Sequence, residues 1–172
     1  MNLFKFIFLF FFIFNLSSLK AEVPYILSFN FVLNESVAGK KAQNFLKNKL
    51  ENGLKKLKEK ETKIQEEEKK IIQQKKLITP EEYKKKVSEL RNNVSSLQKE
   101  RNSLLESIAK NRAKARSELL KNLNPILKEY MKEKNIKMVL DKKSILLSDE
   151  RLDITQDIIK RLNEKLKSIK LN

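Results

Sequence analysis

The longest regular pattern in the chain is a heptad repeat of apolar residues. Beyond residue 46, an apolar residue recurs at every seventh position, at Leu50, Leu57, Ile64, Ile71 and Ile78. The second seam position of each heptad is apolar at Leu46 and Leu54 but charged further out. Apolar residues at this spacing line one side of an α-helix and are typical of a coiled-coil seam. The pattern predicts a long helix whose apolar seam thins with distance from residue 46.

A second helix of the same kind is predicted after Pro80. Its stripe advances by alternating steps of four and three residues, through Tyr83, Val87, Leu90, Val94, Leu97, Arg101, Leu104 and Ile108. Arg101 is the charged member of this stripe, which indicates another coiled-coil seam. The apolar positions continue at Ala115, Leu119, Leu123, Ile126 and Tyr130, and the helix is expected to end near Asn135.

The junction between the two helices carries the signals of a helix start. Thr79 is a suitable N-cap, Pro80 suits the first helical turn, and Glu82 follows Thr79 by three residues, as in a capping box. Pro80 also disfavours helical backbone at Thr79. Local chemistry alone leaves open a kinked but continuous helix.

The register of the two stripes favours a hairpin over a kink. When two helices run antiparallel, residues that face each other have numbers with a nearly constant sum. The sum is 161 for four apolar pairs, which are Ile78 with Tyr83, Ile71 with Leu90, Ile64 with Leu97 and Leu57 with Leu104. Glu61 and Arg101 are then expected to pair within an arm roughly 50 Å long. Leu77, Ile78 and Tyr83 fall at its tip, where we expect them to close the seam rather than to contact a partner.

The residues on either side of the arm predict a small α+β body. Residues 23–29 (VPYILSF) predict a strand, and a helix is expected from Val37 after a cap at Ser36 or Asn34. Residues 137–140 and 144–148 predict a β-hairpin or two adjacent strands. Residues 155–169 predict an amphipathic helix that starts after Asp153. Three strands and one short helix make a small core, which favours an oligomer.

The first 21 residues follow a different pattern from the rest of the chain. Lys5 precedes a continuous apolar run over residues 6–14, and a more polar stretch ends in Ala21. This layout predicts a secretory signal that is cleaved after Ala21. An uncleaved membrane anchor is the alternative, but the apolar run is short for a bilayer span.

Composition narrows the chemistry that the chain can perform. The net charge is +16, and removal of residues 1–21 takes away Lys5 and Lys20 and leaves +14, which favours an anionic partner. The chain has no Cys, no His and only two Gly. It therefore lacks the residues for a disulfide, an imidazole base, a Cys/His zinc site or a phosphate-binding glycine loop. We expect neither an enzyme nor a cofactor or metal, and we interpret residues 66–68 (EEE) as a solvated acidic run.

Three segments outside the arm carry a resemblance to a known family. They are VLNESVAGKKAQ at residues 32–43, NIKMVLDKKSILLS at residues 135–148 and LDITQDIIKRLNE at residues 152–164. With the signal and the charged hairpin, the chain resembles the Skp/OmpH family of periplasmic holdase chaperones. The resemblance implies a predominantly α, α+β homotrimer, with a small β-barrel body and one long antiparallel α-helical coiled-coil hairpin per subunit. It also implies that unfolded outer-membrane proteins are held between the arms without ATP, in the periplasm.

The expected organisation divides the chain into four parts. Residues 1–21 are the signal, residues 22–45 begin the body, residues 46–118 form the arm with its tip at 77–82, and residues 119–172 complete the body. Residues expected in the oligomeric body are Ile26, Phe29, Val139, Leu140, Ile145, Leu147, Ile154 and Ile158. Cations that are candidates for client binding are Lys55, Lys56, Lys84, Lys85, Lys86, Arg112, Lys114 and Arg116.

Other interpretations of these features stay open at this point. The basic runs are also consistent with solvated helix faces. The whole chain is also consistent with a structural coiled coil tethered to the envelope, or with a basic nucleic-acid or lipid binder. Anionic lipid or lipopolysaccharide is a further candidate partner, although the family's basic patch has no residue-by-residue match here. Nucleic acid is not expected as a physiological partner, because the signal directs the chain out of the cytosol.

Overall fold

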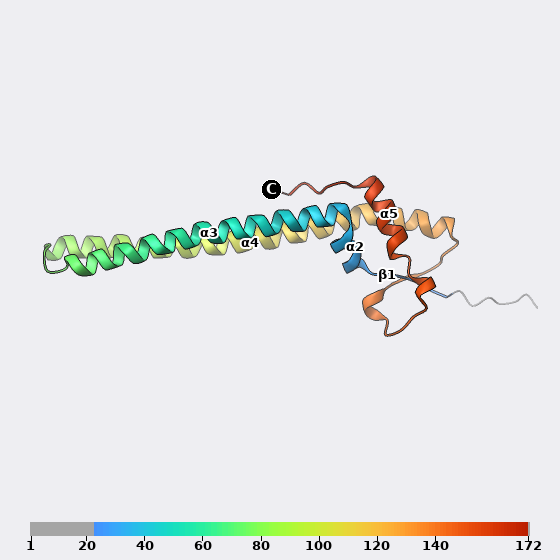
Figure 1. Cartoon of the computed structure of the whole chain (residues 1–172), viewed down its shortest axis with the longest axis horizontal. Coiled ribbons are helices and arrows are strands. Elements are labelled where there is room, and N and C mark those ends of the chain that lie inside the picture. Colours follow the sequence, from blue (N-terminus) through green and yellow to red (C-terminus); the bar gives the residue numbers. More distant parts are fainter. Residues whose placement is uncertain (1–22, 172) are drawn as a thin grey trace, which may run out of the picture.

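The computed structural model describes residues 23–171 and consists of a long helical hairpin on a small body (Figure 1). Helices α3 (Val37–Gln74) and α4 (Pro80–Glu133) form the hairpin. The body contains strands β1 (Tyr25–Leu27) and β2 (Val139–Asp141) and helices α2 (Phe29–Glu35) and α5 (Thr155–Lys165). The expected predominance of helix is confirmed. The predicted signal at residues 1–21 lies outside the described residues.

The break at Thr79 is the turn of a hairpin, as the register predicted, and not a kink. Helix α3 ends at Gln74, a few residues earlier than Ile78, and α4 runs back along it (Figure 1). The Thr79 hydroxyl accepts a hydrogen bond from the Glu82 amide at 3.2 Å, and Glu82 Oε2 accepts one from the Thr79 amide at 3.1 Å. Both bonds of a capping box are therefore present at the start of α4.

Helix α4 ends where the sequence predicted, in a Schellman motif. Asn135 has a φ of 53°, in the left-handed region that Asn tolerates better than most residues. The amide of Ile136 donates to the carbonyl of Met131 at 2.8 Å, and the amide of Asn135 donates to the carbonyl of Lys132 at 3.3 Å. The chain therefore leaves the helix sharply and returns to the body.

The first strand is shorter than predicted, and a helix replaces its end. The Ser28 hydroxyl accepts a hydrogen bond from the Phe31 amide at 3.3 Å and caps α2, so Phe29 is helical and not part of a strand. Phe29 and Val32 are both buried one helical turn apart, and this packing outweighs the β propensity of the segment. Ser36 then caps α3 by accepting from the Gly39 amide at 3.1 Å.

The predicted β-hairpin after the arm is wrong. Strand β2 pairs with β1 in parallel, with Ile26 opposite Leu140. On the other side of β1, Asp153 forms a parallel bridge to Ile26, and the Ile154 amide donates to the Ile26 carbonyl at 2.9 Å. Residues 142–144 form a 3₁₀ turn capped by the side chain of Asp141. Because this turn leads the chain away from the sheet, residues 145–148 form no strand.

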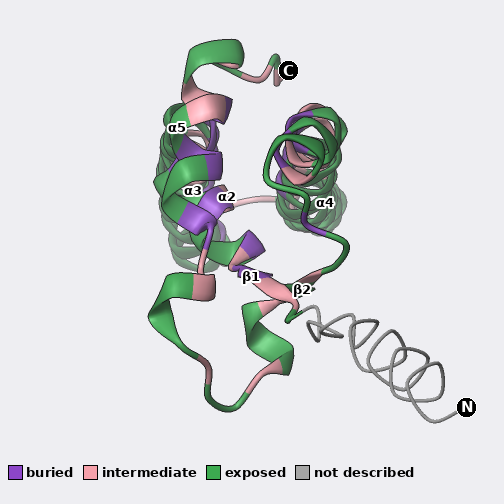
Figure 2. Cartoon of the chain, turned by 90° about the vertical axis from the view of Figure 1, so that its right-hand side faces the viewer, coloured by how far each residue is buried: buried purple, intermediate pink, exposed green. Residues whose placement is uncertain are grey.

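The core lies where α4, α5 and α2 meet beside β1 (Figure 2). Helix α5 is shorter than predicted because the backbone becomes extended at Leu166, although Leu166 and Ile169 still pack against the core. The buried members of the core are Leu27, Phe29, Val32, Leu119, Leu123, Ile126, Tyr130, Ile136, Ile154, Ile158, Ile159 and Leu162. The body thus closes around the base of the arm, and the rest of the hairpin projects from it.

Candidate functional site

The seam of the arm is only partly closed. Leu57 and Ile71 are buried between α3 and α4, whereas Leu54 and Val94 are exposed. Across the seam, Lys60 Nζ lies 2.5 Å from Glu100 Oε1. The expected pair of Glu61 with Arg101 does not form, because Glu61 pairs with Lys58 on its own helix at 3.1 Å. A thin seam leaves apolar side chains along the arm accessible to a partner.

The tip differs from the prediction in one respect. Ile78 and Tyr83 are half-buried, and Lys75 Nζ lies 5.5 Å from the centre of the Tyr83 ring. Leu77, which was expected to help close the seam, is instead 82 % exposed. It lies in the turn between α3 and α4, where its amide donates to the Gln74 carbonyl at 2.8 Å. The tip therefore presents an apolar side chain beside the adjacent cations Lys75 and Lys76.

The eight predicted client-binding cations fall into separate groups along the arm. Lys55, Lys56, Lys84, Lys85 and Lys114 are exposed, and Lys86 is half-buried. Arg112 and Arg116 come together near the body, where Arg116 stacks on the Phe29 ring at 4.5 Å. Within residues 23–171, none of the eight forms an ion pair. Their charges are thus available to an anionic partner.

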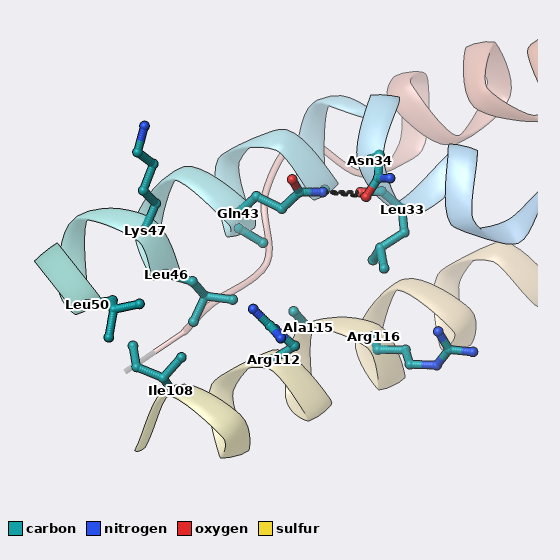
Figure 3. Close-up of a pocket in the computed structure, with 12 residues that line it drawn as sticks. Leu33, Asn34, Gln43, Leu46, Lys47, Leu50, Ile108, Arg112, Ala115 and Arg116 are labelled. Atoms are coloured by element: carbon teal, nitrogen blue, oxygen red, sulfur yellow. Dashed lines mark hydrogen bonds between the residues drawn. The ribbon is translucent and has the colours of Figure 1, made fainter. Parts of the chain in front are cut away.

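A pocket that the sequence did not predict opens at the base of the arm, between α2, α3 and α4 (Figure 3). Its volume is about 520 Å³. Most of the pocket surface is apolar, and the cations Lys47, Arg112 and Arg116 are among the residues that line it. The lining residues are Leu33, Asn34, Gly39, Ala42, Gln43, Leu46, Lys47, Leu50, Ile108, Arg112, Ala115 and Arg116. We name this the arm-base pocket. The heptad pattern places Leu46, Leu50 and Ile108 on the seam, but it contains no signal that α2 crosses beside them.

Gln43 connects helices α2 and α3 beside the arm-base pocket. Its side-chain amide donates to Asn34 Oδ1 at 2.8 Å and to the Leu33 carbonyl at 3.3 Å, which ties α3 to the end of α2 (Figure 3). Arg112 extends from α4 toward the space between the helices (Figure 3). The pocket is therefore a shaped apolar hollow with a positive edge, suited to an apolar group that carries negative charge nearby.

The residues expected in the oligomeric body divide into two sets. Ile26, Phe29, Ile154 and Ile158 are buried within the single chain, and Val139 packs against the same core. Ile145 is half-buried, Leu140 lies at the border of exposure, and Leu147 is 91 % exposed. Its neighbour Leu146, which was not among the predicted residues, is fully exposed. The second set is thus available to a partner chain.

No group of three or more potential ligand side chains in residues 23–171 is arranged to hold a metal ion. The acidic residue Glu67 accepts a hydrogen bond from Asn93 across the arm at 3.3 Å. None of the described helices combines the length and apolar character that crossing a bilayer requires.

Comparison with known proteins identifies the family. Residues 25–162 match the family described as outer membrane protein (OmpH-like), and this match covers most of the chain. The chain therefore belongs to the OmpH-like family. No curated protein matches the chain.

A solved structure supports the fold. The chain is similar to an OmpH-like protein from Caulobacter crescentus CB15, whose assignment as an outer membrane chaperone is itself provisional. The TM-score is 0.79 at 18% sequence identity, and the likeness covers 88% of this chain and 91% of that chain. At this identity the likeness shows that the two proteins share a fold.

Proposed function

We propose that the protein is an ATP-independent holdase chaperone of the periplasm that binds unfolded outer-membrane proteins between helical arms. The observation that carries the proposal is the projecting α3–α4 hairpin in a member of the OmpH-like family. Its apolar seam is incomplete, and its cations Lys55, Lys56 and Lys114 form no ion pair among residues 23–171. Such a surface offers many weak contacts along the arm, as expected for a partner without fixed structure.

Charge favours the capture of acidic chains in this mechanism. Lys55, Lys56 and Lys114 lie exposed on the arm without an ion-pair partner in the part of the chain that the structure describes. Long-range attraction raises the rate of encounter with an acidic client, whereas the exposed apolar positions Leu54 and Val94 supply short-range contact. Neither step consumes a nucleotide.

The proposal includes a homotrimer with a β-barrel body. Strand β1 pairs with β2, but the resulting sheet has only two strands among the described residues. The half-exposed Leu140 and the exposed Leu147 would be covered by neighbouring copies. A trimer would also bring three arms around one cavity.

An aggregation assay tests the holdase activity. A urea-unfolded outer-membrane barrel is diluted into buffer with and without the mature protein, in the absence of nucleotide, and light scattering is followed. We expect the protein to suppress scattering. We expect the triple variant Lys55→Gln, Lys56→Gln, Lys114→Gln to suppress scattering less than the native chain does, and we expect this difference to be larger at low salt than at high salt. A matched control replaces Lys132, Lys134 and Lys137 at the body end with Gln. Undiminished scattering with the native chain would contradict the proposal.

The mass of the exported protein tests whether the predicted signal is cleaved. Cleavage after Ala21 predicts that the exported protein begins at Glu22. An intact Met1 would instead favour the envelope-tethered coiled coil.

The exposed tip favours anionic lipid as a second partner. Leu77 projects beside Lys75 and Lys76, a combination suited to a negatively charged membrane surface. We expect Leu77→Ser to reduce binding to vesicles that contain anionic lipid. Binding to purely zwitterionic vesicles serves as the control, and equal binding to both would contradict this role.

A further inference from the structure

The two faces of the α3–α4 hairpin differ in chemistry. On one face, polar bonds cross between the two helices. Lys60 pairs with Glu100 there, and the side-chain amide of Asn93 donates to Glu67 Oε2 at 3.3 Å. All four residues line one groove together with Ser96. We name this side of the hairpin the bonded face, because its polar side chains bind each other across the arm.

The opposite face has a groove in the outer part of the arm, with a volume of about 480 Å³. Ile72 and Val94 line this groove and are 62% and 50% exposed, and Arg91 lies beside them. Val94 and Ser96 lie about 200° apart around α4, so the two grooves open on opposite sides of the hairpin. We name this groove the outer groove and this side of the hairpin the open face.

Heptad spacing places the arm-base pocket on the open face as well. Residues that are seven apart share one side of a coiled-coil helix. Arg91 of the outer groove lies three heptads before Arg112 of the arm-base pocket, and Leu105 lies between them on the same line. Val94 likewise lies two heptads before Ile108 in the pocket wall. The open face therefore runs from the base of the arm to the outer groove.

Exposed apolar side chains recur along the open face. Leu54 belongs to it, because Leu54 lies two heptads before Glu68 of the outer groove. The exposed fraction is between 47% and 62% for the apolar set Leu54, Ile72, Val94 and Leu105. Burial of apolar surface is favourable, so this face can accept apolar groups of a partner.

Three arginines of α4 lie among these apolar positions. Arg91, Arg101 and Arg112 follow one another at intervals of about 16 Å along the helix. None of the three forms an ion pair among residues 23–171. Arg101 lies one heptad after Val94, and Arg112 extends toward the space between the helices (Figure 3). The open face therefore offers unpaired positive charge along its length.

The acids of the open face leave this positive charge in excess. The same spacing places Glu51 and Glu61 on its α3 side. Glu51 lies 3.9 Å from Lys47, and Glu61 lies 3.1 Å from Lys58, each pair on one helix. Glu68 is the acid of the outer groove. Among the described residues of this face, one unpaired acid therefore stands against three unpaired arginines, which favours a partner with acidic side chains.

We propose that an extended segment of the unfolded client, with apolar and acidic side chains, binds along the open face from the arm-base pocket to the outer groove. The inference rests on the proposed holdase function and names the face of the arm that performs it. Unfolded chains sample extended backbone, so little ordering is needed. Helix α3 rises by about 38 Å between Lys47 and Ile72, which matches about eleven residues of an extended chain.

Single-cysteine variants test which face contacts the client, because the native chain contains no cysteine. Val94→Cys and Leu105→Cys place a thiol on the open face. Ser96→Cys and Ser103→Cys are the matched controls, two residues away on the other side of α4, and all four positions are exposed. Each variant is oxidised with a urea-unfolded outer-membrane barrel that carries one cysteine. We expect the open-face thiols to form the mixed disulfide about five times faster, because binding raises their effective concentration. Rates are normalised to reaction with a small disulfide.

Charge removal tests the role of the arginines. Arg101→Gln with Arg112→Gln removes two charges from the open face, and Lys99→Gln with Lys110→Gln removes two charges from the other side of α4; all four side chains are exposed. The probe is a labelled peptide of about twelve apolar and acidic residues, and its binding is measured by fluorescence anisotropy. We expect the open-face variant to weaken binding about tenfold at low salt and the control variant about twofold or less. Peptides of half this length should bind the native chain more weakly.

The outcomes separate this inference from the proposed function. Equal normalised rates on the two faces, in a chain that still suppresses aggregation, would overturn the open-face contact and leave the holdase standing. Covalent dimers of Val94→Cys in place of the client adduct would also overturn it, because another copy would then cover the face. Equal losses of peptide binding in the two charge variants would overturn the role of the arginines. Failure of the native chain to suppress aggregation would instead count against the holdase.

Discussion

The Tyr130 hydroxyl donates a 2.6 Å hydrogen bond to Asp157 Oδ2 and so joins the end of α4 to α5. Arg161 lies 4.7 Å from the centre of the Tyr130 ring. Its Nη1 and Nη2 also donate to the Glu133 carboxylate, at 2.9 and 2.6 Å. Burial, followed by the hydrogen bond and the charge of Asp157, raises the pKa of Tyr130 to about 12. The hydrogen bond from the neutral Tyr130 hydroxyl thus connects helix α4 of the arm to helix α5 of the body.

Removal of this hydroxyl should weaken the body. Tyr130→Phe keeps the ring but leaves Asp157 without its donor, and we expect the free energy of unfolding to fall by about 1–2 kcal/mol at neutral pH. Urea unfolding followed by circular dichroism measures the change. Tyr83→Phe, at the half-buried tip, is the matched control and should have a smaller effect.

The raised pKa of Tyr130 predicts a loss of folding stability at alkaline pH. Because the folded pKa of Tyr130 lies above the value of about 10 for an unfolded chain, its contribution is present below pH 10 and is lost as the pH rises toward 12. Tyr130→Phe should lack this part of the decline. Tyrosinate absorbance of the native chain should contain a component near pH 12 that Tyr130→Phe lacks. An equal alkaline loss of stability in both proteins would contradict the assignment.

Asp153 should make the body sensitive to acid. Its Oδ1 accepts from the Thr155 amide at 2.9 Å and its Oδ2 lies 2.7 Å from Lys142 Nζ. Burial acts to raise its pKa, but the hydrogen bonds from Lys142 and Thr155 outweigh burial and hold the pKa below its usual value. The stabilisation is therefore present above about pH 4 and is lost as the pH falls through the lower folded pKa.

The substitution Asp153→Asn tests whether the charge of Asp153 stabilises the folded chain above about pH 4. We expect the variant to be less stable than the native chain at pH 7 and the difference to shrink below about pH 4. Thermal unfolding across this pH range measures both quantities. Glu150→Gln, an exposed acid in the same segment, is the control, and a difference that persists at low pH would rule out the charge of Asp153 as its source.

The arm was predictable from the sequence because its apolar spacing and its caps point to the same structure. Leu57 and Ile71 recur on one helix face, and Thr79 and Glu82 supply a local start signal, so no distant contact was needed. The body was harder to predict. Residues 29–35 and 145–148 contain β-forming residues in short runs, and their structure depends on caps by Ser28 and Asp141 and on packing against α4 and α5. The arm-base pocket depends on that same packing.

Gly39 should resist replacement for a steric reason. A Cβ atom at this position would collide with the carbonyl oxygen of Leu33 and lie 2.8 Å from Ser36 Oγ. In an open helix Gly→Ala stabilises by about 1 kcal/mol, but here we expect Gly39→Ala to destabilise by about 1–3 kcal/mol. Gly53→Ala is the matched control, because the atoms nearest to its Cβ would all belong to the movable side chain of Leu104. A higher melting temperature for Gly39→Ala than for the native chain would contradict this account.

The left-handed residue after α4 should discriminate between substitutions. Asn135 has a φ of 53°, which Gly adopts freely and a β-branched residue adopts only with strain. We expect Asn135→Gly to keep or slightly raise stability and Asn135→Val to lower it by about 1–2 kcal/mol. Urea unfolding of the two variants decides the matter, and equal stability would show that the turn relaxes to another conformation.

The incomplete seam predicts unequal effects for identical substitutions along α3. Leu57 is buried against α4, whereas Leu54, less than one turn away, is 47% exposed. Leu57→Ala should therefore cost about 2–3 kcal/mol, and Leu54→Ala less than about 1 kcal/mol. Hydrogen exchange of the arm amides measures the local free energy of opening, and global unfolding serves as the reference. If Leu54 is instead a contact for unfolded chains, Leu54→Ala should weaken aggregation suppression while leaving exchange in the arm nearly unchanged. Equal effects of both substitutions on exchange would show that the two leucines contribute alike to the seam.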